Sequence, residues 1–119
     1  GAPATVLRVD DDKDPDGGWG PRVFLHRRSR PGDDRVALFA HLQAPRCLPG
    51  DELRPGDTFA EVGGPPHNGN WHPHLHLQLL RLPTFEEIFL TRCRDLDGYG
   101  PPARARELAR LFPDPLREW

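Results

Sequence analysis

The stretch that decides the fold reads Trp71-His-Pro-His-Leu-His-Leu-Gln-Leu-Leu80. We expect a strand over residues 74–81, and side chains alternate between the two faces of a strand. One face then carries the polar side chains of His74, His76 and Gln78. The other face carries the apolar side chains of Leu75, Leu77 and Leu79. Held on a core by its leucines, this strand would aim two imidazoles at one metal ion or one substrate.

Two histidines are too few for a zinc site, since zinc takes four ligands and a catalytic zinc keeps one position for water. The best third donor is His41, at the end of an expected strand over residues 35–41. His67 and His72, in the loop before His74, are further candidates for the metal or its groove, as is Gln78. The alternative is a solvated polar face on a half-exposed strand, which is the commoner outcome for an isolated His-x-His pair.

The rest of the chain favours a small β-rich domain. With 119 residues it is long enough for one domain with a single core, and its 12 glycines and 15 prolines indicate many turns. The expected strands cover residues 4–9, 22–26, 35–41, 58–62 and 74–81. Helices are expected over residues 85–90 and 103–112. We therefore expect one mainly β domain over residues 1–119. It comprises an antiparallel sheet folded toward a sandwich (residues 1–82) and a helical C-terminal extension (residues 83–119).

Composition excludes some partners. The net charge is −2 and the arginines are scattered, so no basic surface for nucleic acid is expected. No apolar run approaches the ~20 residues that cross a bilayer, and the first residues are not those of a signal peptide. Cys47 and Cys93 allow one disulfide or two unpaired thiols. Trp19, in Gly18-Trp19-Gly20, is interpreted as a packing residue where a hairpin starts.

Several segments together resemble the lysostaphin/LytM-type zinc metallopeptidases, which have a duplicated hybrid motif fold and cut peptide cross-links in bacterial cell walls. Phe39-Ala40-His41-Leu42 resembles that family's aromatic-Ala/Gly-His-Leu segment. Leu48-Pro-Gly-Asp-Glu-Leu-Arg-Pro-Gly-Asp57 is similar to its doubled turn, and His74-Leu75-His76-Leu77 to its His-Leu-His-aromatic signature. The stretch from Gly63 to Gln78 also resembles a subgroup fused between a kinase-like domain and a class III aminotransferase.

The resemblance implies zinc as the cofactor and a peptide or peptidoglycan-like substrate. It implies that His76 is a zinc ligand and that His41 and His74 are the catalytic histidines, which orient the zinc-bound water and stabilise the oxyanion. A family-typical protein would act in the bacterial periplasm or outside the cell, whereas a fusion enzyme would be cytoplasmic.

The chain departs from the family at its other two ligands, which come from an earlier His-x-x-x-Asp motif. No histidine here has an aspartate four residues later. Residues 4–9 already look like the strand that follows this motif, so we expect it upstream of Gly1, in a chain truncated at its N-terminus. The alternative is a degenerate, non-catalytic peptide- or glycan-binding or regulatory module, or an accessory domain of a larger enzyme. An exposed sheet edge could also pair two chains into an oligomer.

Overall fold

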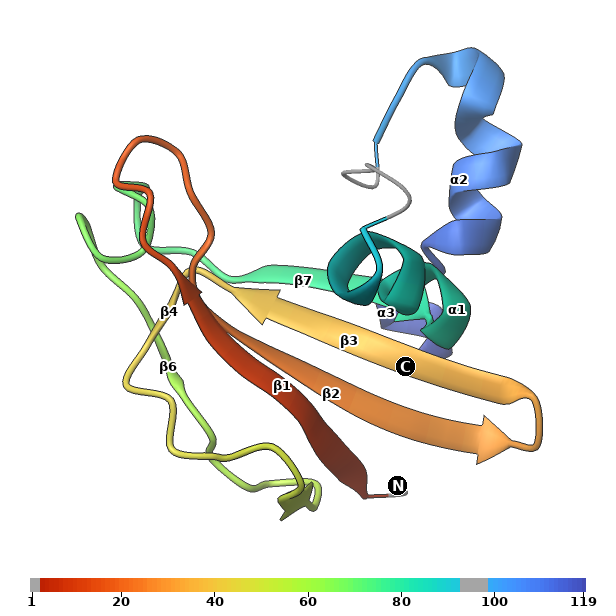
Figure 1. The fold of residues 1–119 in the computed structure, drawn as a ribbon, viewed down its shortest axis with the longest axis horizontal. Coiled ribbons are helices and arrows are strands. Elements are labelled where there is room, and N and C mark those ends of the chain that lie inside the picture. The colour runs from red at the N-terminus through yellow and green to blue at the C-terminus, as the bar shows by residue number, and fades with distance from the viewer. Residues whose placement is uncertain (1–2, 93–98) are drawn as a thin grey trace.

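The computed structural model describes residues 3–92 and 99–119 (Figure 1). Its main element is a five-stranded antiparallel sheet with the order β5-β1-β2-β3-β7. These strands are β1 (Ala4–Asp12), β2 (Gly20–Arg30), β3 (Asp33–Ala40), β5 (Glu52–Leu53) and β7 (His76–Arg81). A small second sheet pairs β4 (Leu42–Gln43) with β6 (Glu61–Val62). The expectation of a mainly β, antiparallel fold is confirmed. In the described part, the second layer of the expected sandwich is largely irregular chain with only this two-residue pairing.

Both faces of the main sheet are covered. The helix-covered face packs apolar side chains of β2, β3 and β7 against the helical segment after β7: Phe24, Val36, Leu38, Ala40, Leu80 and Phe85. The loop-covered face packs β1 and β2 against the irregular chain between β3 and β7 and against Trp119: Val6, Val23, Leu25, Leu42, Cys47 and Phe59. In Figure 1 the helix α1 and the chain around β4 and β6 lie on opposite sides of the sheet.

The helical part begins directly after the last strand. α1 (Leu82–Phe85) continues into a π-helical turn, η1 (Glu86–Leu90). A 3₁₀ turn, η2 (Pro102–Arg104), leads into α2 (Ala105–Leu111), and α3 (Pro115–Glu118) ends the chain. The two expected helices are therefore present, the first starting earlier than expected and the second as a 3₁₀ turn followed by an α-helix, and α3 was not expected. None of the helices described is long and apolar enough to cross a membrane.

Several expected boundaries were wrong. The strand expected over residues 74–81 begins only at His76, and the one expected over residues 58–62 shrinks to Glu61–Val62. As a result Leu75 lies outside the strand and is 46% exposed, instead of holding it to the core. His76 and Gln78 do share one face, because Ala40 pairs with His76 and Leu38 with Gln78.

Two expectations stay open. Cys47 is buried, but Cys93 lies outside the described residues. Both alternatives for these cysteines, one disulfide or two unpaired thiols, therefore stay open. At the β1 edge, β5 pairs only with Ala4 and Thr5. The remainder of β1 carries Arg8 and three aspartates, and charged side chains on an edge disfavour pairing with a second chain. An oligomer formed through a sheet edge stays a prediction.

Candidate functional site

The structure brings together the three histidines expected to share a site. His41 directly follows Ala40, the residue of β3 that pairs with His76 of β7. The centroid of the His41 ring lies 4.6 Å from that of His74 and 5.8 Å from that of His76. Residues more than thirty positions apart in the sequence thus meet at one end of the sheet.

His41 is held by backbone and side-chain contacts. Its φ of 58° is left-handed, a conformation in which histidine is enriched among non-glycine residues. Its backbone N–H donates to Trp19 O (2.8 Å) and its carbonyl accepts from Gly63 N (2.9 Å). The ring is buried, and its Nδ1 lies 2.8 Å from Asn68 O. Because a carbonyl can only accept, Nδ1 carries the proton and Nε2 of the neutral ring keeps its lone pair.

Burial lowers the pKa of His41 below its usual value, and the neighbouring His74 and His76 lower it further by charge repulsion. The hydrogen bond to Asn68 O acts in the opposite direction but is the smaller effect. His41 is therefore neutral near pH 7 and can accept a proton at Nε2.

This lowered pKa predicts a pH-dependent stability. Below about pH 6.5 the unfolded chain takes up a proton at His41 while the folded chain resists it. The contribution of neutral His41 is therefore full above pH 6.5 and is lost as the pH falls toward the lower pKa of the folded state. Urea unfolding measures this effect: the free energy of unfolding should fall less between pH 7.5 and pH 5.5 in His41→Gln than in the unmodified protein. His67→Gln, at an exposed position, should keep the full loss, and an equal loss in His41→Gln would contradict the assignment.

His74 and His76 are each anchored through one ring nitrogen. Nδ1 of His74 donates to His72 O (2.6 Å), which leaves its Nε2 available. Nε2 of His76 lies 3.1 Å from Oε1 of Gln78, and donation to that oxygen leaves Nδ1 available. Each of the three imidazoles thus has one nitrogen oriented by a hydrogen bond and one that makes no such contact with the described residues.

Two indole rings border the cluster. Trp19 is parallel to His41, with centroids 6.3 Å apart, and contacts His76 edge-on at 4.8 Å. Trp71 lies 6.0 Å from His41 and 6.3 Å from His74. A solvent-open cavity of about 280 Å³ is formed by Gly17, Gly18, Trp19, His41, Trp71, His76 and Tyr99. We call this cavity the histidine groove.

Two loops are joined to form this groove. Asn68 is fully buried and its side-chain amide donates to Gly63 O (3.2 Å) and Trp71 O (2.9 Å), while its Oδ1 accepts from Trp71 N (3.1 Å). The indole Nε1 of Trp71 donates to Gly18 O (3.0 Å) of the loop between β1 and β2. Gly69 has φ +94° and packs so closely that a Cβ there would overlap Gly18 O. Only glycine fits that contact, so residues 63–71 follow a path that the sequence closely dictates.

The other candidate residues lie outside the groove. His67 is exposed and borders a separate cavity with Asp11, Lys13 and Asp14. His72 is also exposed and serves the site through its carbonyl, which accepts from His74. Gln78 is brought to the site through its contact with His76.

The sequence interpretation missed the walls of the groove. Trp19 was interpreted as a packing residue, and no role was assigned to Asn68, Trp71 or Tyr99. A signal for Asn68 and Trp71 was present, since both fall in the run of turn-forming residues directly before the histidines. An Asn-Gly pair there predicts a tight turn, and the tryptophan beside it predicts an aromatic side chain close to the site.

Within residues 3–92 and 99–119, no three His, Cys, Asp or Glu side chains are grouped so as to hold a metal ion. The three histidines are neighbours, but their ring nitrogens do not converge on one point in this structure. No protein-family model, no curated protein and no solved structure matches this chain.

Proposed function

We propose that this chain is a domain of the zinc-peptidase type that contributes the histidine part of a hydrolytic site. His41 and His74 are the catalytic side chains, and His76 is a zinc ligand. The substrate is a peptide or peptidoglycan-like cross-link bound in the histidine groove. The observation that supports this function is the meeting of His41, His74 and His76 beside an open cavity.

The donor chemistry fits zinc in kind. A histidine that ligates zinc commonly donates its other ring N–H to an oxygen acceptor, which fixes its orientation. His76 has this arrangement, with Nε2 directed at Gln78 and Nδ1 available. Because the described residues gather no set of three donors, further ligands would come from outside them. When bound, zinc would lower the pKa of its water to about 7.

The residues of this chain can supply proton transfer. His41, neutral near pH 7 and fixed by Asn68, can accept a proton at Nε2 as a general base. His74 is exposed and anchored through Nδ1 to His72 O, which directs its Nε2 away from that contact; a ring with a proton on both nitrogens would donate from Nε2 to a developing oxyanion. The indoles of Trp19 and Trp71 both lie beside His41 and contribute to its burial.

A second function, peptide or glycan binding without hydrolysis, is favoured by a different observation. The groove has three aromatic walls, with Trp71 45% and Tyr99 78% exposed. Exposed aromatic side chains bury large apolar areas when a ligand covers them. This function needs no metal.

Zinc binding and hydrolysis separate the two functions. The protein, incubated with zinc and gel-filtered, should retain metal measurable by mass spectrometry, and His76→Ala should weaken retention about ten-fold or more. His67→Ala, outside the groove, is the matched control and should behave as the unmodified protein. Dye-labelled peptidoglycan is the second probe. Its cleavage, lost in His41→Ala and His74→Ala, supports the enzyme.

Two outcomes would contradict the proposed hydrolytic function. One is peptidoglycan binding without cleavage at saturating zinc, which favours the binding module. The other is zinc retention that is equal in the unmodified protein and in His76→Ala, which removes the ligand role of His76.

A further inference from the structure

Three arginines stand side by side on the loop-covered face of the sheet. Arg27 of β2 pairs with Arg35 of β3, and Arg35 pairs with Arg81 of β7. Residues directly opposite each other across antiparallel strands have their Cβ atoms about 5 Å apart, and like charges so placed destabilise a sheet. Negatively charged groups close to the row would offset this repulsion.

The contacts of the three arginines differ in kind. Arg35 forms ion pairs with Asp33 and with Glu118 (3.6 Å to the latter). Arg81 donates from Nε to Arg110 O (2.7 Å). Among the residues that the structure describes, Nε of Arg27 is buried without a hydrogen-bond partner, as are Nε and Nη1 of Arg35. For Arg27 the contact is aromatic, since its guanidinium carbon lies 5.5 Å from the centroid of the Trp119 ring. A buried donor without an acceptor costs about 1–3 kcal/mol.

Arg27 also borders a cavity of about 260 Å³. We call it the Arg27 pocket; its walls are Leu25, Arg27, Phe39, Leu53, Phe59 and Trp119, and the turn over residues 54–57 forms its mouth. At that mouth the carboxylate of Asp57 accepts from the backbone N–H of Arg54 (2.8 Å). Arg27, Arg54 and Asp57 thus border an apolar, aromatic interior, and the excess of arginine over aspartate among them favours an anion.

We propose that the Arg27 pocket binds a small organic carboxylate with an apolar body. Arg27 recognises the carboxylate through paired N–H donors, the geometry in which guanidinium binds carboxylates most strongly. Phe39, Phe59 and Trp119 cover the apolar part. The volume lies near the lower limit of ligand sites, about 300 Å³, so the occupant is one small molecule or the last residue of a peptide.

This pocket is separate from the histidine groove. Arg35, opposite Arg27, lies six residues before His41 along β3, which corresponds to roughly 20 Å of extended chain. The two cavities share no lining residue. Binding at the Arg27 pocket therefore does not depend on the proposed hydrolytic function.

The test compares matched ligands on the folded protein by two-dimensional NMR. N-acetyl-phenylalanine should shift the Trp119 indole signal and leave the Trp71 indole signal in place, whereas its uncharged amide should bind about 10- to 100-fold more weakly. A glycine-rich peptide ending in phenylalanine distinguishes the source. If the peptide binds more tightly than N-acetyl-phenylalanine, the ligand is a peptide C-terminus. If it binds equally or more weakly, the ligand is a free carboxylic acid.

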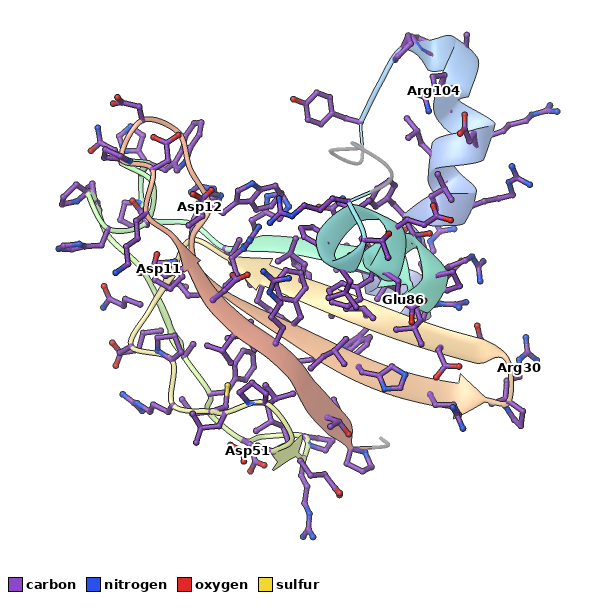
Figure 2. The ribbon with its side chains drawn as sticks, viewed as in Figure 1. Asp11, Asp12, Arg30, Asp51, Glu86 and Arg104 are labelled. Atoms are coloured by element: carbon purple, nitrogen blue, oxygen red, sulfur yellow. The ribbon has the colours of Figure 1, made fainter. Side chains whose placement is uncertain are left out.

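Variants test the role of Arg27 itself. Arg27→Gln should weaken N-acetyl-phenylalanine binding about 10- to 100-fold. Arg27→Lys keeps the positive charge but lacks the paired N–H donors of guanidinium, so its affinity should lie between those of the unmodified protein and Arg27→Gln. Arg30→Gln is the control, because Arg30 projects from the β2–β3 turn with its side chain 81% exposed (Figure 2). Three results would overturn the proposal: equal binding of acid and amide, no shift at Trp119 at millimolar ligand, or inorganic sulfate binding as tightly as the aromatic acid. The ligand comparison needs no variant, so it holds even if Arg27→Gln fails to fold.

Discussion

Replacing Phe85 by alanine is expected to lower the free energy of unfolding by about 3–5 kcal/mol. The Phe85 side chain is 1% exposed, and its ring centroid lies 5.3 Å from that of Phe24 and 5.7 Å from that of Phe89. Removing the ring leaves a cavity between α1 and the sheet that the surrounding strands cannot close. Urea unfolding followed by circular dichroism measures this loss of free energy. An unchanged slope of the unfolding free energy against urea concentration would show that the variant exposes as much surface on unfolding as the unmodified protein.

Glu86 provides the control for this substitution. It follows Phe85 in the chain and is exposed (Figure 2), so Glu86→Ala should change the free energy of unfolding by no more than about 0.5 kcal/mol. A loss below about 1 kcal/mol in Phe85→Ala would mean that the helical segment is not part of the cooperative core. The segment after β7 would then be an appendage and not a cover for the sheet.

The sheet could be predicted from the sequence where alternation and core contacts agree. In β2, Val23 and Leu25 are buried on one face of the sheet, and in β3, Val36 and Leu38 are buried on the other. Both strands lie inside the sheet, where buried residues alternate regularly along the chain. The segment over residues 58–62 has strand-forming residues but packs Phe59 on the core without a partner strand at that position. Packing of side chains overrides intrinsic preference there.

Two prolines account for the late start of β7 and for the early start of the helix that follows it. Pro73 lacks a backbone donor, and the ring of His74 hydrogen-bonds to the carbonyl of His72, so the chain forms a local turn where a ladder was expected. The helix expected from residue 85 begins at Leu82, so Pro83 does not precede it. It lies instead in the first turn of α1, where its missing N–H costs nothing.

The histidines of the site could be predicted, but the walls that enclose them could not. His41, His74 and His76 were accessible because strand pairing brings the end of β3 to the start of β7. The positions of Trp19 and Trp71 depend on how two loops contact each other, through a glycine at 69 and a hydrogen bond from Trp71 to Gly18. Such contacts between loops leave no periodic pattern in a sequence.

Asn68→Ala is expected to have the second large effect, a loss of about 2–4 kcal/mol of unfolding free energy together with disorder of the groove. The substitution removes the side-chain partner of Gly63 O, which is buried, and of Trp71 O and Trp71 N, which are partly buried. Near-UV circular dichroism should report the changed surroundings of Trp71, and NMR should report the His41 ring, whose Nδ1 depends on Asn68 O for its orientation.

The matched variant Asn68→Asp keeps an oxygen for Trp71 N but replaces the amide donor by a second oxygen. That oxygen would face the carbonyls of Gly63 and Trp71, which accept from the amide in the unmodified protein. A buried carboxylate facing two acceptors is unfavourable, so Asn68→Asp should be at least as unstable as Asn68→Ala near pH 7. It should regain part of the loss at low pH, where a protonated carboxyl can donate again. His67→Ala, one residue earlier and exposed, should match the unmodified protein in both spectra and stability. If Asn68→Asp proved as stable as the unmodified protein at pH 7, the amide would not be the donor that fixes this loop, and the position of Trp71 would have to depend on its contact with Gly18 alone.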